Sequence, residues 1–289
     1  FLPSSGIQFC HGDVTDPDSL SFPLRDVDYV FHLASLIKAR SPSAYYRVNY
    51  LGTINLLEAC QNVAPWLRRV VVVSSLAAVG PSLPGDPLDE SSPCCPTTPY
   101  GNSKWQQEQV ATAYSKRLPV TIIRPPSIYG PRDRETLAIF QCAALGLVPS
   151  LPVEGELSIV HAADAADGIL IAATSAEAVG RTYFIAGDET PSYRELMTLI
   201  GTAVGRHGVK VPVSGWMLRL AGRIAEAARE VTGTPIIFDR WKAEEILGGF
   251  WACRNTRAKC ELGFEPRVPL QRGLADTAKW YRAMGWLLV

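Results

Sequence analysis

Short continuous apolar runs alternate with segments of helical period through the first half of the chain. The runs at 27–34, 69–75 and 119–124 are typical of strands buried on both faces of a parallel sheet, and a shorter run at 7–10 predicts a further strand. Segments 43–63 and 100–117 carry apolar residues at helical spacing. This order predicts an α/β fold: a doubly wound parallel sheet with helices on both faces.

The second half has more helical segments. Its pattern predicts strands at 158–163 and 181–186 and helices at 165–173 and 192–204, followed by helices at 214–231, 237–248, 255–262 and 269–283. We expect a sheet domain over 1–131, rejoined by 158–187, and a smaller, mostly helical domain built from 132–157 and 188–289. Residues 80–98, rich in Pro, Ser, Gly and Asp, predict a long loop, and loops of this length are usually functional.

Composition excludes several classes of protein. The 289 residues include 47% apolar residues, 28 basic and 28 acidic residues, which argues against disorder, a nucleic-acid partner and a polybasic membrane surface. No apolar run approaches the ~18 residues of a membrane span. The seven cysteines fit no zinc pattern, so we expect no metal site and free thiols in a reducing cytoplasm. The chain opens on Phe1 without a visible signal peptide.

The strongest chemical signal is the pair Tyr100 and Lys104, four residues apart on one predicted helix face. A nearby ammonium favours the phenolate and moves a tyrosine toward service as a general acid/base. Ser74 and Ser75 end a predicted buried strand, and in open α/β sheets ligands bind beyond the carboxyl ends of the strands. The pattern therefore predicts a hydroxyl beside the tyrosine at that edge.

With these residues the chain resembles the extended short-chain dehydrogenases/reductases, the group of nucleotide-sugar epimerases, dehydratases and 3β-hydroxysteroid dehydrogenase-like enzymes. The resemblance covers essentially the whole chain. It rests on the segments 12–14, 30–34, 49–53, 73–75 with 79–80, Tyr100 with Lys104, 124–131, 159–164 and 262–266, and on Trp280-Tyr281 in the final helix. It implies a Rossmann-like fold, a nicotinamide cofactor (NAD or NADP) and a small-molecule substrate.

The resemblance also implies roles for single residues. Tyr100 corresponds to the general acid/base, Lys104 to the lysine that lowers its pKa and binds the nicotinamide ribose, and Ser75 to the catalytic hydroxyl, with Ser74 beside it. Further cofactor contacts are implied at Asp13, Val14, Leu33, Ala34, Ser35, Asn49, Pro125, Ser127 and Ile128. On chemistry alone Asp13 is equally a turn or capping residue, Asn49 a satisfied buried polar group, and His32 a core histidine.

One departure from the family pattern is large. The family opens with a strand, a Gly-rich GxxGxxG turn and a helix whose N-terminus holds the pyrophosphate, and this sequence contains no such motif. We expect that on the order of 40 residues, a βαβ unit with its second strand, are missing by truncation. The preference for NAD or NADP is carried by that second strand, so it stays open. The chain as printed is expected to bind NAD or NADP weakly or not at all.

Within the family, the residues favour interconversion of a secondary alcohol and a ketone. Leu76 and Ala77 stand where dehydratases carry an acidic pair, which disfavours water elimination. No Lys or Arg occurs from 135 to 180, and 211–225 is apolar, so an apolar ring substrate, steroid- or flavonoid-like, is expected. A nucleotide-sugar epimerase, using Arg132, Arg134, Arg181 or Arg254, and a non-catalytic binding protein remain alternatives. Helices 43–63 and 99–117 resemble the family's dimer interface, which makes a homodimer possible.

Overall fold

A four-stranded parallel sheet forms the centre of the computed structural model, which describes residues 6–206, 208–232 and 238–287, without side chains at 229–232. The strands β1 (Tyr29–His32), β2 (Arg69–Val73), β3 (Val120–Arg124) and β7 (Thr182–Phe184) lie side by side in the order β1-β2-β3-β7. Phe31 pairs with Val71, and Val70 with Val120. Because all strands point the same way, their carboxyl ends meet at one edge of the sheet.

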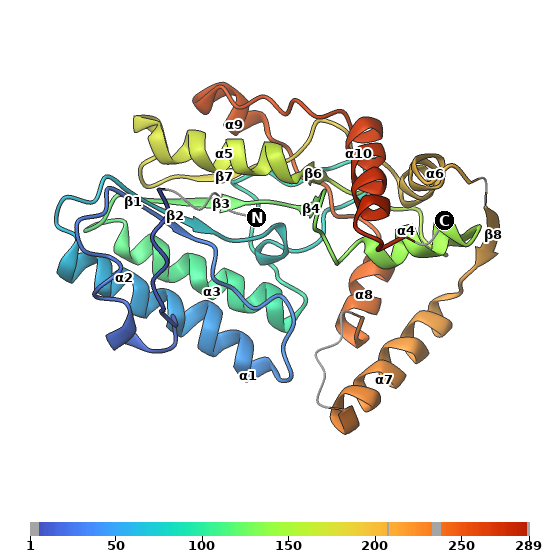
Figure 1. The fold of residues 1–289 in the computed structure, drawn as a ribbon, viewed down its shortest axis with the longest axis horizontal. Coiled ribbons are helices and arrows are strands. Elements are labelled where there is room, and N and C mark those ends of the chain that lie inside the picture. The colour runs from blue at the N-terminus through green and yellow to red at the C-terminus, as the bar shows by residue number, and fades with distance from the viewer. Residues whose placement is uncertain (1–5, 207, 233–237, 288–289) are drawn as a thin grey trace.

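Helices cover both faces of this sheet (Figure 1). On one face lie α1 (Pro42–Tyr45), a π-helical turn (Tyr46–Leu51), α2 (Gly52–Val63) and α3 (Pro99–Tyr114); on the other lie α5 (Ala162–Thr174) and α9 (Thr256–Leu262). The β2 side chains alternate between the two resulting cores, with Val70 and Val72 packed toward α2 and Val71 toward α5. The predicted α/β, Rossmann-like fold is confirmed.

A second layer of elements extends from one end of the sheet (Figure 1). Two small parallel pairs join β4 (Ser127–Tyr129) to β6 (Ile159–His161) and β5 (Leu147–Ser150) to β8 (Val209–Pro212). Around them lie α4 (Leu137–Ala144), α6 (Tyr193–Ala203), α7 (Gly215–Thr232), α8 (Arg240–Gly248) and α10 (Leu270–Ala283). Phe140, Leu274 and Tyr281 belong to the core that these elements share.

The structure corrects several predicted elements. Residues 7–10 form no strand: no described strand pairs with them, and Phe9 is 77% exposed. The predicted helix 43–63 is interrupted by the π-helical turn Tyr46–Leu51. The pattern missed β4, α4, β5 and β8, because each spans eight residues or fewer and shows too little periodicity to be recognised.

The outer strand of the sheet is only partly covered. Phe31 on β1 is 36% exposed, and Leu33 just beyond it is 58% exposed. Large apolar side chains are therefore exposed to solvent at this outer strand. Among the described residues, no helix is long and apolar enough to span a bilayer.

Replacing Gly101 by alanine is expected to destabilise the fold, because the new Cβ would lie 2.3 Å from the carbonyl oxygen of Ala77, a backbone atom with little freedom to move. Overpacking of this kind costs about 1–3 kcal/mol of unfolding free energy. Chemical denaturation followed by circular dichroism measures the loss. Gly248→Ala, where the Cβ meets nothing within 4 Å, is the matched control. Equal stability of the two variants would contradict the close approach.

Candidate active site

The end of β2 delivers Ser74 and Ser75 to the sheet edge. Ser75 is the N-cap of a short 3-10 helix (Leu76–Ala78), and its hydroxyl accepts a hydrogen bond from the Ala77 amide at 3.1 Å. This cap turns the chain sharply as it leaves the strand, as N-cap hydroxyls do. Ser75 is therefore held at the strand end and remains partly exposed.

The first turn of α3 places Tyr100 against Ser75. Thr98 caps the helix by accepting a hydrogen bond from Gly101 N at 2.9 Å, and Pro99 occupies the first helical position, where its missing N–H costs nothing. The glycine lets this turn approach the backbone of Ala77. As a result, the Tyr100 phenol lies beside the Ser75 side chain, close enough for that hydroxyl to lower the pKa of the phenol.

The environment of Tyr100 raises the pKa of its phenol to about 12, chiefly by burial, while the Ser75 hydroxyl opposes the shift. The Glu245 carboxylate on α8 and Tyr45, whose ring lies edge-on at 6.0 Å, raise it further. This differs from the expected lowering of the pKa by Lys104. The physical reason is that the ammonium of Lys104 is directed elsewhere.

Lys104 is 1% exposed, and its Nζ donates a hydrogen bond to the carbonyl oxygen of Val73 at 2.7 Å. Burial lowers the pKa of this ammonium to about 7, and the Glu108 carboxylate one turn later opposes the shift. Val73 O is its one hydrogen-bond acceptor among the described residues. Because an ammonium has three N–H donors, the remaining donors suit the hydroxyls of a ribose.

A buried ion pair lies directly beneath this lysine. Glu108 on α3 accepts hydrogen bonds from Arg124 Nε at 2.9 Å and Nη2 at 2.6 Å, and from the Ser74 hydroxyl at 2.5 Å. Glu108 and Arg124 are 3% and 6% exposed. The guanidinium also lies over the Phe184 ring, 5.6 Å from its centroid. Ser74 is therefore bound to a buried carboxylate and ties β2 to α3.

Asn49, at the centre of the π-helical turn, is fully buried. Its Oδ1 accepts from the Ser35 hydroxyl and the Leu36 amide, and its Nδ2 donates to Leu36 O and to the Ser103 hydroxyl. Each side-chain donor and acceptor thus has a protein partner. Asn49 therefore links the loop after β1 to α3. This is the role of a satisfied buried polar group, one of the alternatives that the sequence left open. A contact of Asn49 with a cofactor stays a prediction.

The other predicted cofactor residues gather along the same sheet edge but differ in surroundings. Asp13 is exposed and accepts hydrogen bonds from the amide and hydroxyl of Thr15, and these bonds lower the pKa of its carboxyl. Val14 packs against Gly52. The remaining residues follow β1 or β3 at its carboxyl end: Leu33, Ala34, Ser127 and Ile128 are exposed, Ser35 is half-buried, and Pro125 is buried.

These residues fit one half of a dinucleotide. Lys104 has spare buried donors, and Ser75 and Tyr100 stand beside it, as the nicotinamide-ribose half requires. No Gly-rich turn at a helix N-terminus lies beside β1 in the described ranges, so the pyrophosphate has no such cradle there. That the described residues hold the nicotinamide half of a dinucleotide stays a prediction.

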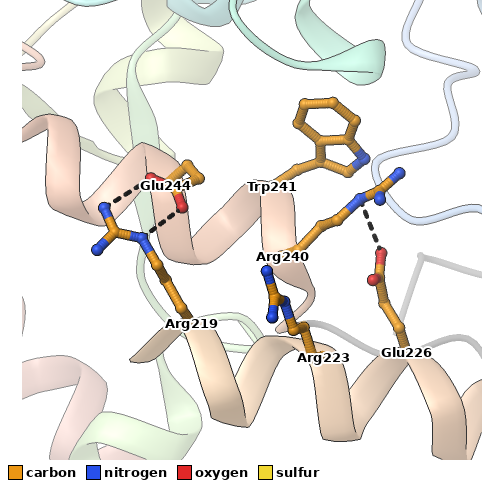
Figure 2. A pocket seen from close by; sticks show the side chains of 6 residues that line it. All are labelled: Arg219, Arg223, Glu226, Arg240, Trp241 and Glu244. Carbon is orange, nitrogen blue, oxygen red and sulfur yellow. Dashed lines mark hydrogen bonds and ion pairs between the residues drawn. The ribbon is translucent and has the colours of Figure 1, made fainter. Parts of the chain in front are cut away.

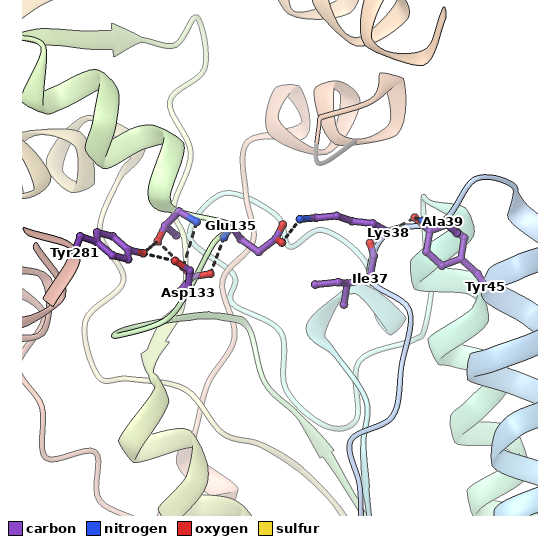
Figure 3. Close-up of polar contacts among 8 residues, drawn as sticks. Ile37, Lys38, Ala39, Tyr45, Asp133, Glu135 and Tyr281 are labelled. Carbon is purple, nitrogen blue, oxygen red and sulfur yellow. Dashed lines mark hydrogen bonds and ion pairs between the residues drawn. The ribbon is translucent and has the colours of Figure 1, made fainter. Parts of the chain in front are cut away.

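An ion pair links two loops that follow different strands (Figure 3). Lys38, in the loop after β1, pairs with Glu135, in the loop after β4. The second loop is held by Asp133, whose carboxylate accepts from the Glu135 amide and whose carbonyl accepts from the Tyr281 hydroxyl at 2.6 Å. Lys38 is therefore neutralised by a carboxylate of the same chain.

Glu108, Gly101 and Tyr45 were missed by sequence reasoning. Glu108 lies four residues after Lys104, on the helix face that also carries Ala111. A charged residue on an otherwise apolar helix face was the available signal. A second signal was Arg124 at the end of an apolar strand, since a buried charge needs a partner. Nothing local to the sequence indicates the contacts of Gly101 or Tyr45.

Unfolding free energy is expected to rise with pH above 7 because of Lys104. Its folded-state pKa, about 7, lies below the ordinary 10.5, so the unfolded chain binds a proton that the native protein lacks between these values. The slope from this group is at most about 1.4 kcal/mol per pH unit. Urea denaturation from pH 7 to 8.5 should show that Lys104→Met loses this rise and that the exposed Lys116→Met keeps it. Parallel pH profiles for all three proteins would contradict the burial of a titrating ammonium.

Comparison with known proteins agrees with this geometry. The sequence matches the model of the NAD dependent epimerase/dehydratase family over residues 2–186. It is 30% identical over 285 residues to ceramide reductase of Caulobacter vibrioides, covering 97% of this chain and 82% of that protein. UDP-glucose 4-epimerase of Vibrio cholerae is 27% identical, with coverage of 95% of this chain and 83% of that protein.

Solved structures share the fold. The dTDP-glucose 4,6-dehydratase DesIV of Streptomyces venezuelae, solved as a double mutant with NAD bound, superposes with a TM-score of 0.76 at 26% identity, covering 98% of this chain and 82% of that one. A further structure with the same fold contains NADPH. The chain therefore belongs to the NAD dependent epimerase/dehydratase family of extended short-chain dehydrogenases/reductases.

Proposed function

We propose that this protein is an NAD(P)-dependent oxidoreductase that interconverts a secondary alcohol and a ketone on an apolar substrate. The observation that carries the proposal is that the side chains of Ser75 and Tyr100 lie together at the carboxyl edge of the sheet, with the buried ammonium of Lys104 one helical turn away. A hydroxyl and a phenol converging on one point suit a single substrate oxygen.

In this proposal Tyr100 exchanges a proton with the substrate oxygen, and Ser75 holds that oxygen by a hydrogen bond. When bound, the nicotinamide accepts or supplies the hydride. A phenol pKa of about 12 keeps Tyr100 protonated at neutral pH, the state in which it can donate a proton to a ketone oxygen. Lys104 contributes donors for the cofactor ribose. Leu76 and Ala77 offer no proton for water elimination, so dehydration is disfavoured.

The arrangement of cations favours an apolar substrate. A nucleotide sugar carries two phosphates, whose burial without cations is costly. Arg134 lies over the Trp286 ring at 5.0 Å, Arg181 pairs with Glu261, and Arg254 pairs with Asp86 at 3.6 Å. Three of the four arginines considered for phosphate binding thus have other partners, and Arg132 has a contact of its own as well.

The similar proteins divide between the two substrate classes. Ceramide reductase, by its name, reduces a lipid, whereas the epimerase acts on UDP-glucose. The greater identity to the lipid enzyme supports the apolar assignment, and we extend it to ring alcohols of steroid or flavonoid type. We also propose that 1–131 with 158–187 holds the dinucleotide, that 132–157 and 188–289 shape the substrate pocket, and that a homodimer forms through α2 and α3.

Tyr100→Phe is expected to lower kcat at least about a hundredfold, because it removes the proton-transfer group, while KM for the cofactor changes little. The measurement is steady-state reduction of apolar ketones with NADH or NADPH at millimolar concentration. Tyr114→Phe, at the far end of the same helix, is the control. Near-normal turnover in Tyr100→Phe would refute the assignment of Tyr100. Ligand binding without turnover by the unmodified protein would instead indicate a non-catalytic binding protein.

A thermal-shift series is expected to show stabilisation by steroid, flavonoid or long-chain alcohols and none by UDP-glucose or dTDP-glucose at equal concentration. Ligands that bind only the native state raise the melting temperature in proportion to RT ln(1 + [L]/Kd). Stabilisation by the sugar nucleotides that is lost in Arg132→Ala would contradict the apolar assignment and support an epimerase. Arg272→Ala, an exposed position on α10, controls for general loss of charge.

A further inference from the structure

Helix α7 exposes an apolar stripe that no described element covers. Trp216, Leu220 and Ile224 follow one another at four-residue spacing, so they lie along one face of the helix. They are 66%, 48% and 60% exposed, and Met217 beside them is 41% exposed. Single exposed apolar residues are ordinary, but a row of large ones that includes a tryptophan marks an interaction site.

The opposite face of α7 is already occupied. Leu218 is 9% exposed, and Gly222 lies so close to α8 that an added Cβ would be 2.9 Å from Asp239 O. Figure 1 shows α7 on the outside of the molecule, beyond α8. Within the described residues, the exposed stripe thus lies on the side of α7 that faces away from α8.

Basic residues border this stripe. Arg219, Arg223 and Arg240 gather beside Trp241 in a surface hollow of about 280 Å³ between α7 and α8 (Figure 2). Glu244 pairs with Arg219 at 2.8 Å, and Glu226 with Arg240 at 3.4 Å.

Arg223 lies between these two pairs, and no ion pair with it occurs among the described side chains. Its charge is therefore not cancelled by a direct partner. The border of the stripe thus carries positive charge.

The surrounding sequence has the same sign of charge. Residues 196–225 contain no Asp or Glu, yet they include Arg206, Lys210, Arg219 and Arg223. Just before α7, strand β8 exposes Val209 and Val211 on either side of Lys210. An apolar surface within an acid-free, basic segment is complementary to lipid tails beneath anionic headgroups.

We propose that α7 docks in the plane of an anionic lipid surface, with Trp216, Leu220 and Ile224 entering the boundary between headgroups and acyl chains and Arg219 and Arg223 facing the lipid phosphates. This surface binding does not depend on the proposed catalytic function. Where both hold, the site is near the lipid, because α8, between α7 and the sheet edge, carries the Glu245 that acts on Tyr100. An apolar alcohol dissolved in the bilayer is then a short distance from the site.

The test is co-sedimentation of the protein with vesicles of phosphatidylcholine containing about 30% phosphatidylglycerol, compared with phosphatidylcholine alone. Binding is expected to the anionic vesicles and to weaken in about 0.5 M NaCl. Leu220→Ser/Ile224→Ser should lower the partition coefficient at least about tenfold, and Arg223→Glu about tenfold, the latter in anionic vesicles only.

The matched control is Phe22→Ser/Trp66→Ser, which removes two large apolar side chains, 66% and 84% exposed, from other elements. All substituted positions are exposed, so circular dichroism should show unchanged folding. Absence of vesicle binding, or equal binding by both double variants, would overturn the proposal. So would light scattering that shows a dimer lost in Leu220→Ser/Ile224→Ser, which would assign the stripe to a second copy. Because no outcome depends on turnover, failure here leaves the catalytic proposal standing, and the reverse.

Discussion

The buried carboxylate of Glu108 holds the candidate site together. It takes hydrogen bonds from Ser74 at the end of β2 and from Arg124 at the end of β3, while its own helix carries Lys104 and Tyr100. Two strand ends and one helix are thus joined at one point. Removing the two charges from water costs free energy. The bidentate hydrogen bonds between Arg124 and Glu108 and the third bond from Ser74 offset much of that cost. Such a pair fixes position more than it adds stability.

The same buried carboxylate also affects the pKa of Lys104, which is shielded from water. Burial pushes the pKa of Lys104 down, and the Glu108 carboxylate pushes it back up. With a pKa of about 7, Lys104 is about half protonated at neutral pH and loses its proton as the pH rises further. Its position is set by Val73 O, so the ammonium faces the same strand end that supplies Ser75. In the described structure Tyr100 therefore lies beside Ser75, whereas Lys104 is bonded to the strand end, and its role toward a bound cofactor stays a prediction.

The fold was predictable because its main signals are local. Buried strands such as Arg69–Val73 are recognised by continuous apolar runs, and helices such as Pro99–Tyr114 by the helical spacing of their apolar residues. Tyr100 and Ser75 could be paired because parallel strand ends and helix starts share one edge. The partner of Lys104 could not be predicted, since Val73 O is a backbone atom whose availability depends on the exact strand end. The π-helical turn at Asn49 also had no local signal, because it depends on bonds to Ser103 and Leu36.

Basic residues near the carboxyl edge of the sheet and basic residues on α7 differ in how many of them are paired with carboxylates. Close to the sheet edge, cations are cancelled by carboxylates of the same chain, as in Arg124 with Glu108 and Lys38 with Glu135. Far from it, α7 and the segment before it hold basic residues beside an apolar stripe. An anionic ligand therefore finds little unpaired positive charge at the carboxyl edge of the sheet and more on the outer face of α7. The candidate site is left with a hydroxyl, a phenol and a shielded ammonium, and this set agrees with the proposal that it handles one oxygen of an otherwise apolar molecule.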